Sequence, residues 1–167
     1  MSRMETKRLI IRDFSLSDAE VIFYFSQEES LKQWLPDQVY SNIDEAKETL
    51  EFMISKYPHK ELPFVLAVVE KESNELVGHV GLSRIKQGIE IGYAIGKQHQ
   101  NKGYASEAVA AFSDWGKRDF GIKEIYGVVD SENHASIKVL ENAGFRFVRD
   151  DVEGEFGKGR CRKTYVK

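Results

Sequence analysis

Cysteine, long apolar runs and metal-ligand spacing are all scarce in this sequence. The 167 residues contain one cysteine, Cys161, so no disulfide forms within the chain. We expect this lone cysteine to be a buried apolar residue in a strand. The longest apolar runs, 64–69 and 21–25, are far too short to span a bilayer. The four histidines lack ligand spacing, and no CxxC or HExxH occurs, so we expect no metal.

A large excess of charge of either sign is also lacking. The chain has 24 Lys and Arg against 27 Asp and Glu, and its pI is about 5.9. Many nucleic-acid binders have an overall basic balance, so we expect no nucleic-acid partner. Basic clusters at 146–149 and 158–163 are interrupted by acidic residues, which is typical of solvated strand faces. With no signal-peptide pattern and no membrane span, we expect a cytoplasmic location and no membrane partner.

The composition that remains is that of one soluble globular domain. Hydrophobic residues make up 41% of the chain and charged residues 31%. No repeat, low-complexity tract or linker divides the sequence, and its three prolines all lie in the first half. We therefore expect a single domain over residues 1–167.

The spacing of apolar residues predicts an α+β fold. We predict strands over 8–14, 64–70, 76–85, 89–95, 125–129, 145–152 and 160–166, and helices over 17–25, from 42 to Pro58, over 103–120 and over 135–143. Ser17 and Glu20 have capping-box spacing at the first helix. Short polar turns between consecutive middle strands indicate an antiparallel meander, whereas the strand–helix–strand unit 89–129 predicts a right-handed crossover between parallel strands. The expected sheet is mixed and mostly antiparallel, with flanking helices.

The segment that follows the meander has the chemistry of an anion cradle. Gln100-x-x-Gly103-x-Ala105 connects a strand to a helix, so free backbone N–H groups and the positive end of the helix dipole face the loop. Gly103 allows a bulky anion to approach the backbone, and Lys97 and Lys102 add positive charge. The alternative is a loop whose glycine only shapes the helix start, because neither a Walker motif nor a dinucleotide fingerprint is present.

This loop is one of several motifs that resemble a single family. Gln100 to Ala105 matches the Gln/Arg-x-x-Gly-x-Gly/Ala signature of the GNAT N-acetyltransferases. Further matches come in the family's order: Thr6-x-Arg8-Leu9-x-Ile11-Arg12, Glu90 to Ile95, and Asn133-x-x-Ser136 followed by Leu140-Glu141-x-x-Gly144-Phe145. The set resembles the RimJ/RimL branch, which contains the ribosomal-protein N-terminal acetyltransferases. The resemblance implies the GNAT acyl-CoA N-acyltransferase fold and acetyl transfer from acetyl-CoA to an amine.

The resemblance assigns the cosubstrate, acetyl-CoA, to two parts of the chain. Its pyrophosphate would lie on the loop formed by Gln100, Asn101, Lys102, Gly103, Tyr104, Ala105 and Ser106. Its pantetheine arm would pair with backbone groups of Tyr93, Ala94 and Ile95, where this strand parts from the next one, and would contact Asn133 and Ser136. Asn133 also suits the N-cap of the helix that follows, and both uses are compatible if different atoms serve them.

Glu90 and Ser136 are the candidate catalytic residues. Glu90 would act as general base, directly or through water; the alternative is an exposed strand end. Ser136 would hydrogen bond near the CoA sulfur and relay a proton. Many relatives have a tyrosine acid four residues before the Gly-Phe pair. Here that position is Leu140, which cannot donate a proton, so Ser136 or water must serve instead.

The acceptor would lie near the segment 27–40, between the first two predicted helices. We expect Glu28, Trp34 and Tyr93 to contact an amine, either a protein N-terminus or a small molecule. The alternative for this segment is a surface loop with ordinary charges. The chain would be a monomer or a homodimer. The departure at Leu140 leaves a non-catalytic CoA-binding regulatory module as the alternative function. A generic interaction domain would require the loop motif to be coincidental.

Overall fold

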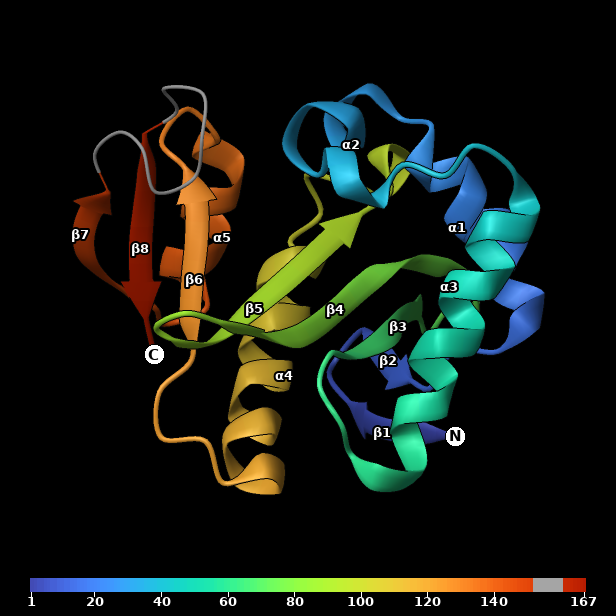
Figure 1. The fold of residues 1–167 in the computed structure, drawn as a ribbon, viewed down its shortest axis with the longest axis horizontal. Coiled ribbons are helices and arrows are strands. Elements are labelled where there is room, and N and C mark those ends of the chain that lie inside the picture. Colours follow the sequence, from blue (N-terminus) through green and yellow to red (C-terminus); the bar gives the residue numbers. More distant parts are fainter. Residues whose placement is uncertain (152–160) are drawn as a thin grey trace.

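One mixed sheet contains every strand of the described residues (Figure 1). The computed structural model describes residues 1–151 and 161–167. The strands are β1 Ser2–Glu5, β2 Leu9–Arg12, β3 Phe64–Glu70, β4 Leu76–Ile85, β5 Gly88–Ile95, β6 Tyr126–Asp130, β7 Arg146–Asp151 and β8 Arg162–Val166. They lie in the order β1-β2-β3-β4-β5-β6-β8-β7, and neighbours are antiparallel except β5 and β6. The predicted mostly antiparallel sheet with one parallel pair is confirmed.

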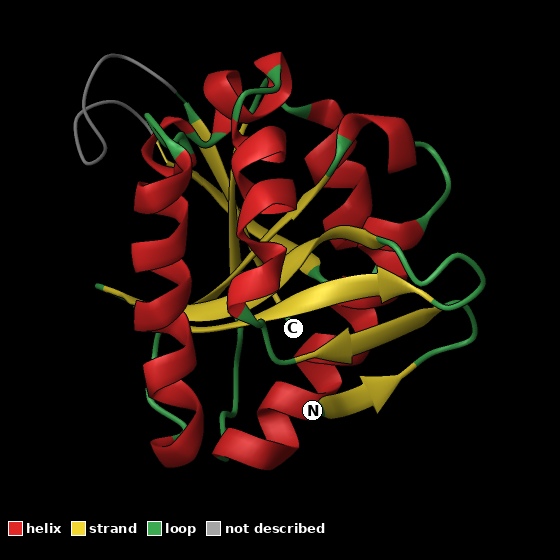
Figure 2. Cartoon of the chain, turned by 90° about the vertical axis from the view of Figure 1, so that its right-hand side faces the viewer, coloured by secondary structure: helices red, strands yellow, loops and turns green. Residues whose placement is uncertain are grey.

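Helices cover both faces of this sheet (Figure 2). They are α1 Ala19–Ser26, α2 Glu29–Trp34, α3 Ile43–Lys56, α4 Tyr104–Phe120 and α5 His134–Asn142. On one face, Phe112 of α4 and Leu140 of α5 belong to one buried core with apolar side chains of the sheet, and Leu140 packs on Gly127 of β6. On the other face, α1 and α3 pack Ile22 and Leu50 against Ala67 and other residues of the sheet. The two faces therefore have separate apolar cores, and the larger core is the one on the side of α4 and α5.

The sequence of α4 is apolar along one stripe and bounded by a glycine at each end. Ala108, Val109 and Phe112 are buried, as the helical spacing predicts. Gly103 precedes the helix with a φ of +82°, and Gly121 follows it with a φ of +66°. This left-handed backbone favours glycine at both positions. The two glycines therefore mark the ends of α4, whose first turn begins in the loop that follows β5.

The crossover through α4 joins β5 to β6, which meet over a single register pair. Glu90 lies opposite Tyr126, and the described residues contain no second pair between these strands. β5 stays paired with β4 as far as Ile95, and β6 stays paired with β8 as far as Asp130. The two strands therefore diverge beyond Glu90, as Figure 1 shows, and we call this divergence the split.

The N-terminal part departs most from the sequence predictions. β2 is shorter than the predicted strand 8–14, and β1, which the sequence does not predict, is a polar segment that pairs along β2. The segment 27–40 contains the short helix α2, whose six residues are too few to show a helical period. Ser15 and Asp18 form the capping box before α1, so the prediction of Ser17 and Glu20 was wrong.

The C-terminal strands agree with the predictions where they are described. The predicted strand ends at residues 152 and 160 lie outside the described residues. Cys161 is exposed just before β8, so the expectation of a buried strand cysteine was wrong. None of the helices in the described ranges combines the length and apolar character needed to cross a bilayer.

Phe64 provides a test of the larger core. Its side chain is fully buried, with ring centroids 5.3 Å from Tyr57 and 5.1 Å from Phe120. We expect Phe64→Ala to lower the free energy of unfolding by about 3–5 kcal/mol, because a buried aromatic ring leaves a cavity. Phe52→Ala, at a half-exposed ring on α3, should cost less than about 1 kcal/mol. Urea unfolding measures both, and equal losses would contradict this account of the core.

Candidate functional site

The split leaves backbone polar groups of β5 without a strand partner on the side of β6. The carbonyl of Ala94 lies against Gly78 and so points toward β4. Because N–H and C=O directions alternate along a strand, the N–H and C=O of Tyr93 and the N–H of Ile95 point toward the split. Two of the three predicted backbone contacts thus face the split, whereas the backbone of Ala94 is engaged with β4.

The loop after β5 has the backbone shape of an anion site. A 3-10 turn over Lys97–His99 is followed by Asn101 and Gly103, whose φ angles are 61° and 82°. The side-chain amide of Gln100 donates to the carbonyl of Ile95 at 2.8 Å, which anchors the loop to the end of β5. The N–H groups of the first turn of α4 have no partner within the helix. The structure therefore brings the predicted loop residues together around the helix N-terminus.

Arg8, which precedes β2, fixes this loop from a distant part of the chain. Its Nη1 donates to the carbonyl of Lys102 at 2.7 Å, and its Nε donates to Glu107 of α4 at 2.7 Å. Burial raises the pKa of Glu107, but hydrogen bonds from Thr6 and Arg8 outweigh it and hold that pKa below its usual value. Glu107 therefore stays ionised and keeps the guanidinium in place. The Thr6-x-Arg8 motif was the signal for this clamp, although sequence reasoning used it only as a resemblance.

The glycine of the loop lies directly beside this guanidinium. A Cβ on Gly103 would be 3.2 Å from Nη2 of Arg8. The side chain of Tyr104 is buried and is not available to a ligand. Its ring lies 4.7 Å from the Arg8 guanidinium, and its hydroxyl donates to Glu70. Tyr104 can therefore offer an anion only its backbone N–H. An open glycine, a cation and a helix N-terminus converge here, which fits a diphosphate.

The turn between α1 and α2 is attached to the start of the same loop. The carboxylate of Glu28 accepts the N–H of Lys97 at 2.9 Å, and the ring of Phe25 packs directly on Gly96. Trp34 is half-buried on α2, which lies near the C-terminal end of β5 (Figure 1). Glu28, predicted to contact an acceptor, is observed to tie the turn between α1 and α2 to the loop.

Glu90 lies on the sheet face opposite α4. The next residue, Ile91, is buried in the core with α4, so strand alternation turns Glu90 and Gly92 to the other face. A Cβ on Gly92 would meet nothing within 4 Å, so this face is open beside Glu90. Burial raises the pKa of Glu90, and the positive charge of Arg162 offsets part of that rise. Sequence reasoning gave no role to Arg162. A half-buried carboxyl beside open space has the properties of a general base.

The first turn of α5 carries the other predicted side chains. Oδ1 of Asn133 accepts the N–H of Ser136 at 3.2 Å, which confirms Asn133 as the N-cap. Its amide nitrogen has no hydrogen bond within residues 1–151 and 161–167, so it can bind a ligand as well. The hydroxyl of Ser136 lies 2.6 Å from that of Tyr93. Leu140 is buried and packs on Gly127 of β6.

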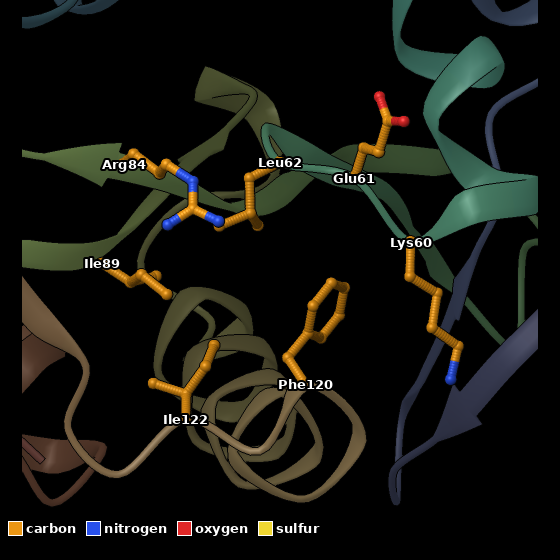
Figure 3. Close-up of a pocket in the computed structure, with 7 residues that line it drawn as sticks. All are labelled: Lys60, Glu61, Leu62, Arg84, Ile89, Phe120 and Ile122. Carbon is orange, nitrogen blue, oxygen red and sulfur yellow. The ribbon is translucent and has the colours of Figure 1, made fainter.

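One hollow is lined by residues other than those predicted for the site. A hollow of about 350 Å³ lies at the far end of α4 (Figure 3), and it is lined by Lys60, Glu61, Leu62, Arg84, Ile89, Phe120 and Ile122. It includes none of the predicted site residues. Among the described residues, no three His, Cys, Asp or Glu side chains are grouped as metal ligands.

Comparison with known proteins agrees with this geometry. The sequence model of the family described as "Acetyltransferase (GNAT) domain" matches residues 8–146. This range includes the Arg8 clamp, the loop, Glu90 and Ser136.

Three similar proteins illustrate the range of relatives. The chain is 29% identical to "Uncharacterized N-acetyltransferase p20" of Bacillus licheniformis, over 99% of this chain and 94% of that protein. It is 25% identical to a spermidine N(1)-acetyltransferase of Vibrio cholerae, over 95% and 92% of the two chains. Its fold matches the ribosomal-protein-S5-alanine acetyltransferase of Vibrio fischeri with a TM-score of 0.84 at 23% identity, over 100% and 96%.

The clamp on the loop predicts how acetyl-CoA affinity responds to Arg8. Arg8→Gln removes the charge and the bonds to Glu107 and Lys102, so we expect acetyl-CoA to bind about tenfold more weakly or worse. Arg3→Gln is the matched control, because Arg3 makes a similar pair with Asp13 (2.7 Å) away from the loop. Isothermal titration calorimetry measures both. Unchanged affinity in Arg8→Gln, or equal losses in the two variants, would contradict the clamp.

Proposed function

This chain belongs to the GNAT acetyltransferase family, and we propose that it acetylates a primary amine by direct attack on acetyl-CoA in a ternary complex. Membership makes it an acetyl-CoA-dependent N-acetyltransferase. One observation carries the proposal: the split between β5 and β6 leads directly into the loop clamped by Arg8. An extended ligand with a diphosphate at one end has matching partners in both places.

Acetyl-CoA would lie along β5 and the start of α4. The diphosphate would rest on the first N–H groups of α4, where Gly103 leaves the backbone open. The pantetheine amides would pair with the free backbone groups of Tyr93 and Ile95, as an added strand does. The amide nitrogen of Asn133 would contact the same arm. When bound, acetyl-CoA supplies a thioester carbonyl that an amine can attack.

Glu90 would prepare the acceptor on the open face of β5. An amine is protonated at neutral pH and must lose a proton before it attacks, and a carboxylate with a raised pKa is suited to take it directly or through water. Gly92 leaves space for the amine beside Glu90. A backbone N–H of β5 at the split would stabilise the oxyanion, and Ser136 would hydrogen bond to the departing thiolate.

The acceptor would be a primary amine, either at a protein N-terminus or on a small molecule. The names of the spermidine and S5-alanine acetyltransferases refer to a polyamine and to a protein residue, so both classes are candidates. Glu28 and Trp34 would face the acceptor from the α1–α2 side, by charge and by an aromatic surface. The shared requirement is a free amine that reaches Glu90.

A panel of amines tests the activity. We expect CoA release with an alanine-initiated peptide or with spermidine, and none with the same peptide acetylated at its N-terminus. Glu90→Gln should lower kcat/KM by at least about a hundredfold and leave acetyl-CoA binding unchanged. Binding of acetyl-CoA with no transfer to any amine would favour a regulatory CoA-binding module instead. Full activity of Glu90→Gln would remove this residue from the mechanism.

The raised pKa of Glu90 also predicts a stability effect of known sign. Because the folded protein holds this proton more tightly than the unfolded chain does, folding stability falls as pH rises through the interval between the two pKa values. Glu90→Gln removes that loss. We expect the variant to melt above wild type at neutral pH, with the difference shrinking below the ordinary glutamate pKa. Scanning calorimetry at neutral pH and at a pH below the ordinary glutamate pKa measures the two melting temperatures. A variant that melts below wild type at neutral pH would contradict this prediction.

A further inference from the structure

Tyr93 connects the split to the first turn of α5 through its hydroxyl. This hydroxyl lies 2.6 Å from Oγ of Ser136 and donates to the carbonyl of Ser136 at 3.1 Å. The residue comes from the middle of β5 and is packed against the larger core. A strand residue thus reaches across the divergence to the one hydroxyl expected near the CoA sulfur.

The two hydroxyls carry two hydrogens and have three acceptors between them. In one arrangement Tyr93 donates to the Ser136 carbonyl, and Ser136 donates to the Tyr93 oxygen. In the other, Tyr93 donates to Oγ of Ser136, and the hydrogen of Ser136 is free to point elsewhere. No other side chain of the described residues bonds to Oγ of Ser136, so Tyr93 alone selects between these arrangements.

The apolar side chain of Leu140 makes the hydroxyl pair of Tyr93 and Ser136 important. It is 1% exposed and packs on Gly127, so the position where many relatives have a tyrosine is part of the core here. A tyrosine hydroxyl nevertheless reaches the first turn of α5 from β5. The fold therefore contains a phenol at the split although the usual position for one is apolar.

We propose that Tyr93 is a positioning residue that turns the Ser136 hydroxyl toward the CoA sulfur as the thiolate leaves, an inference that rests on the proposed function. The C–N bond forms, the nitrogen gives its extra proton to water, and the C–S bond breaks with its electron pair passing to sulfur. Ser136 then rotates its hydrogen onto the thiolate, and Tyr93 rotates its own from the carbonyl to Oγ. Both hydroxyls keep their protons, and the thiolate later takes one from water.

The chemistry of Tyr93 is consistent with rotation rather than proton transfer. Burial raises the pKa of Tyr93 to about 12, although its bond to Ser136 works in the opposite direction. A phenol of that acidity remains protonated throughout turnover at neutral pH. It can therefore donate a hydrogen bond but does not supply the proton of the thiol.

The test is the pKa of the thiol of CoA bound to the protein. This pKa is measured from the ultraviolet absorbance of the thiolate as pH is raised. This readout needs neither an acceptor nor turnover. We expect bound CoA to ionise at lower pH in wild type than free CoA does. Tyr93→Phe and Ser136→Ala should each raise the pKa of the bound thiol by about one unit, the value of one charge-assisted hydrogen bond. The double variant should show no further rise, because the two act as one unit.

Tyr57→Phe is the matched control, because Tyr57 is also buried and bonds to Val65 and Phe14 far from the split. It should lower stability as much as Tyr93→Phe does, without changing the thiol. A second readout is kinetic: Tyr93→Phe should lower kcat about tenfold and leave KM for acetyl-CoA unchanged.

Two outcomes separate this inference from the proposed function. If CoA binds and the thiol of Tyr93→Phe titrates as in wild type, or if the shifts of the two single variants add, the role of Tyr93 is wrong and the acetyltransferase proposal stands. If CoA does not bind to wild type at all, the proposed function fails, and the inference fails with it.

Discussion

The single register pair between Glu90 and Tyr126 is the constraint on which the rest of the site depends. A sheet satisfies its backbone groups by pairing, and two strands that part must leave some of those groups to another partner. β5 stays paired with β4 as far as Ile95, and β6 stays paired with β8 as far as Asp130, so each strand is still held by its other neighbour beyond the point of divergence. The free groups are consequently fixed in direction before any ligand arrives, which lowers the entropic cost of binding.

Three connections anchor the loop that follows β5. Gln100 bonds back to Ile95, Arg8 bonds to the carbonyl of Lys102, and Glu28 accepts the N–H of Lys97. The first is local, but the other two come from the N-terminal strand region and from the turn between α1 and α2. The loop therefore has a shape that its own sequence does not determine. Glu28 and Arg8 hold two points of the same loop, Lys97 and Lys102, so the turn between α1 and α2 and the residue before β2 are joined through this loop.

Sequence patterns were sufficient for the parts of the fold with strong periodicity. The meander, α4 and the parallel crossover follow from alternation, a helical stripe and short turns, and the loop followed from its motif. β1 and α2 could not be predicted because each is short and polar, and tertiary pairing rather than local preference determines its structure.

The candidate site could be predicted as a set of residues, but its contacts could not. Asn133 and Gly103 have local structural roles that a sequence can reveal. Asn133 caps α5, and Gly103 has a left-handed backbone conformation. The bond between Tyr93 and Ser136 joins residues 43 positions apart, and the clamp of Arg8 on Glu107 joins residues 99 apart. The Thr6-x-Arg8 motif marks one side of the clamp, but a single sequence contains no signal that identifies Glu107 or Lys102 as its partner. The roles given to Glu90, Ser136, Glu28 and Trp34 remain proposals.

The most direct test of the acetyl-CoA site is thermal melting with and without acetyl-CoA in wild type, Gly103→Val and Gly121→Val. Both glycines have positive φ, so both variants carry similar backbone strain, but only Gly103 lies in the loop. We predict that a hundredfold excess of acetyl-CoA over Kd raises the melting temperature of wild type and of Gly121→Val by about 5–10 °C. Gly103→Val should show almost no rise. An equal rise in all three proteins, or none in wild type, would contradict the placement of acetyl-CoA on this loop.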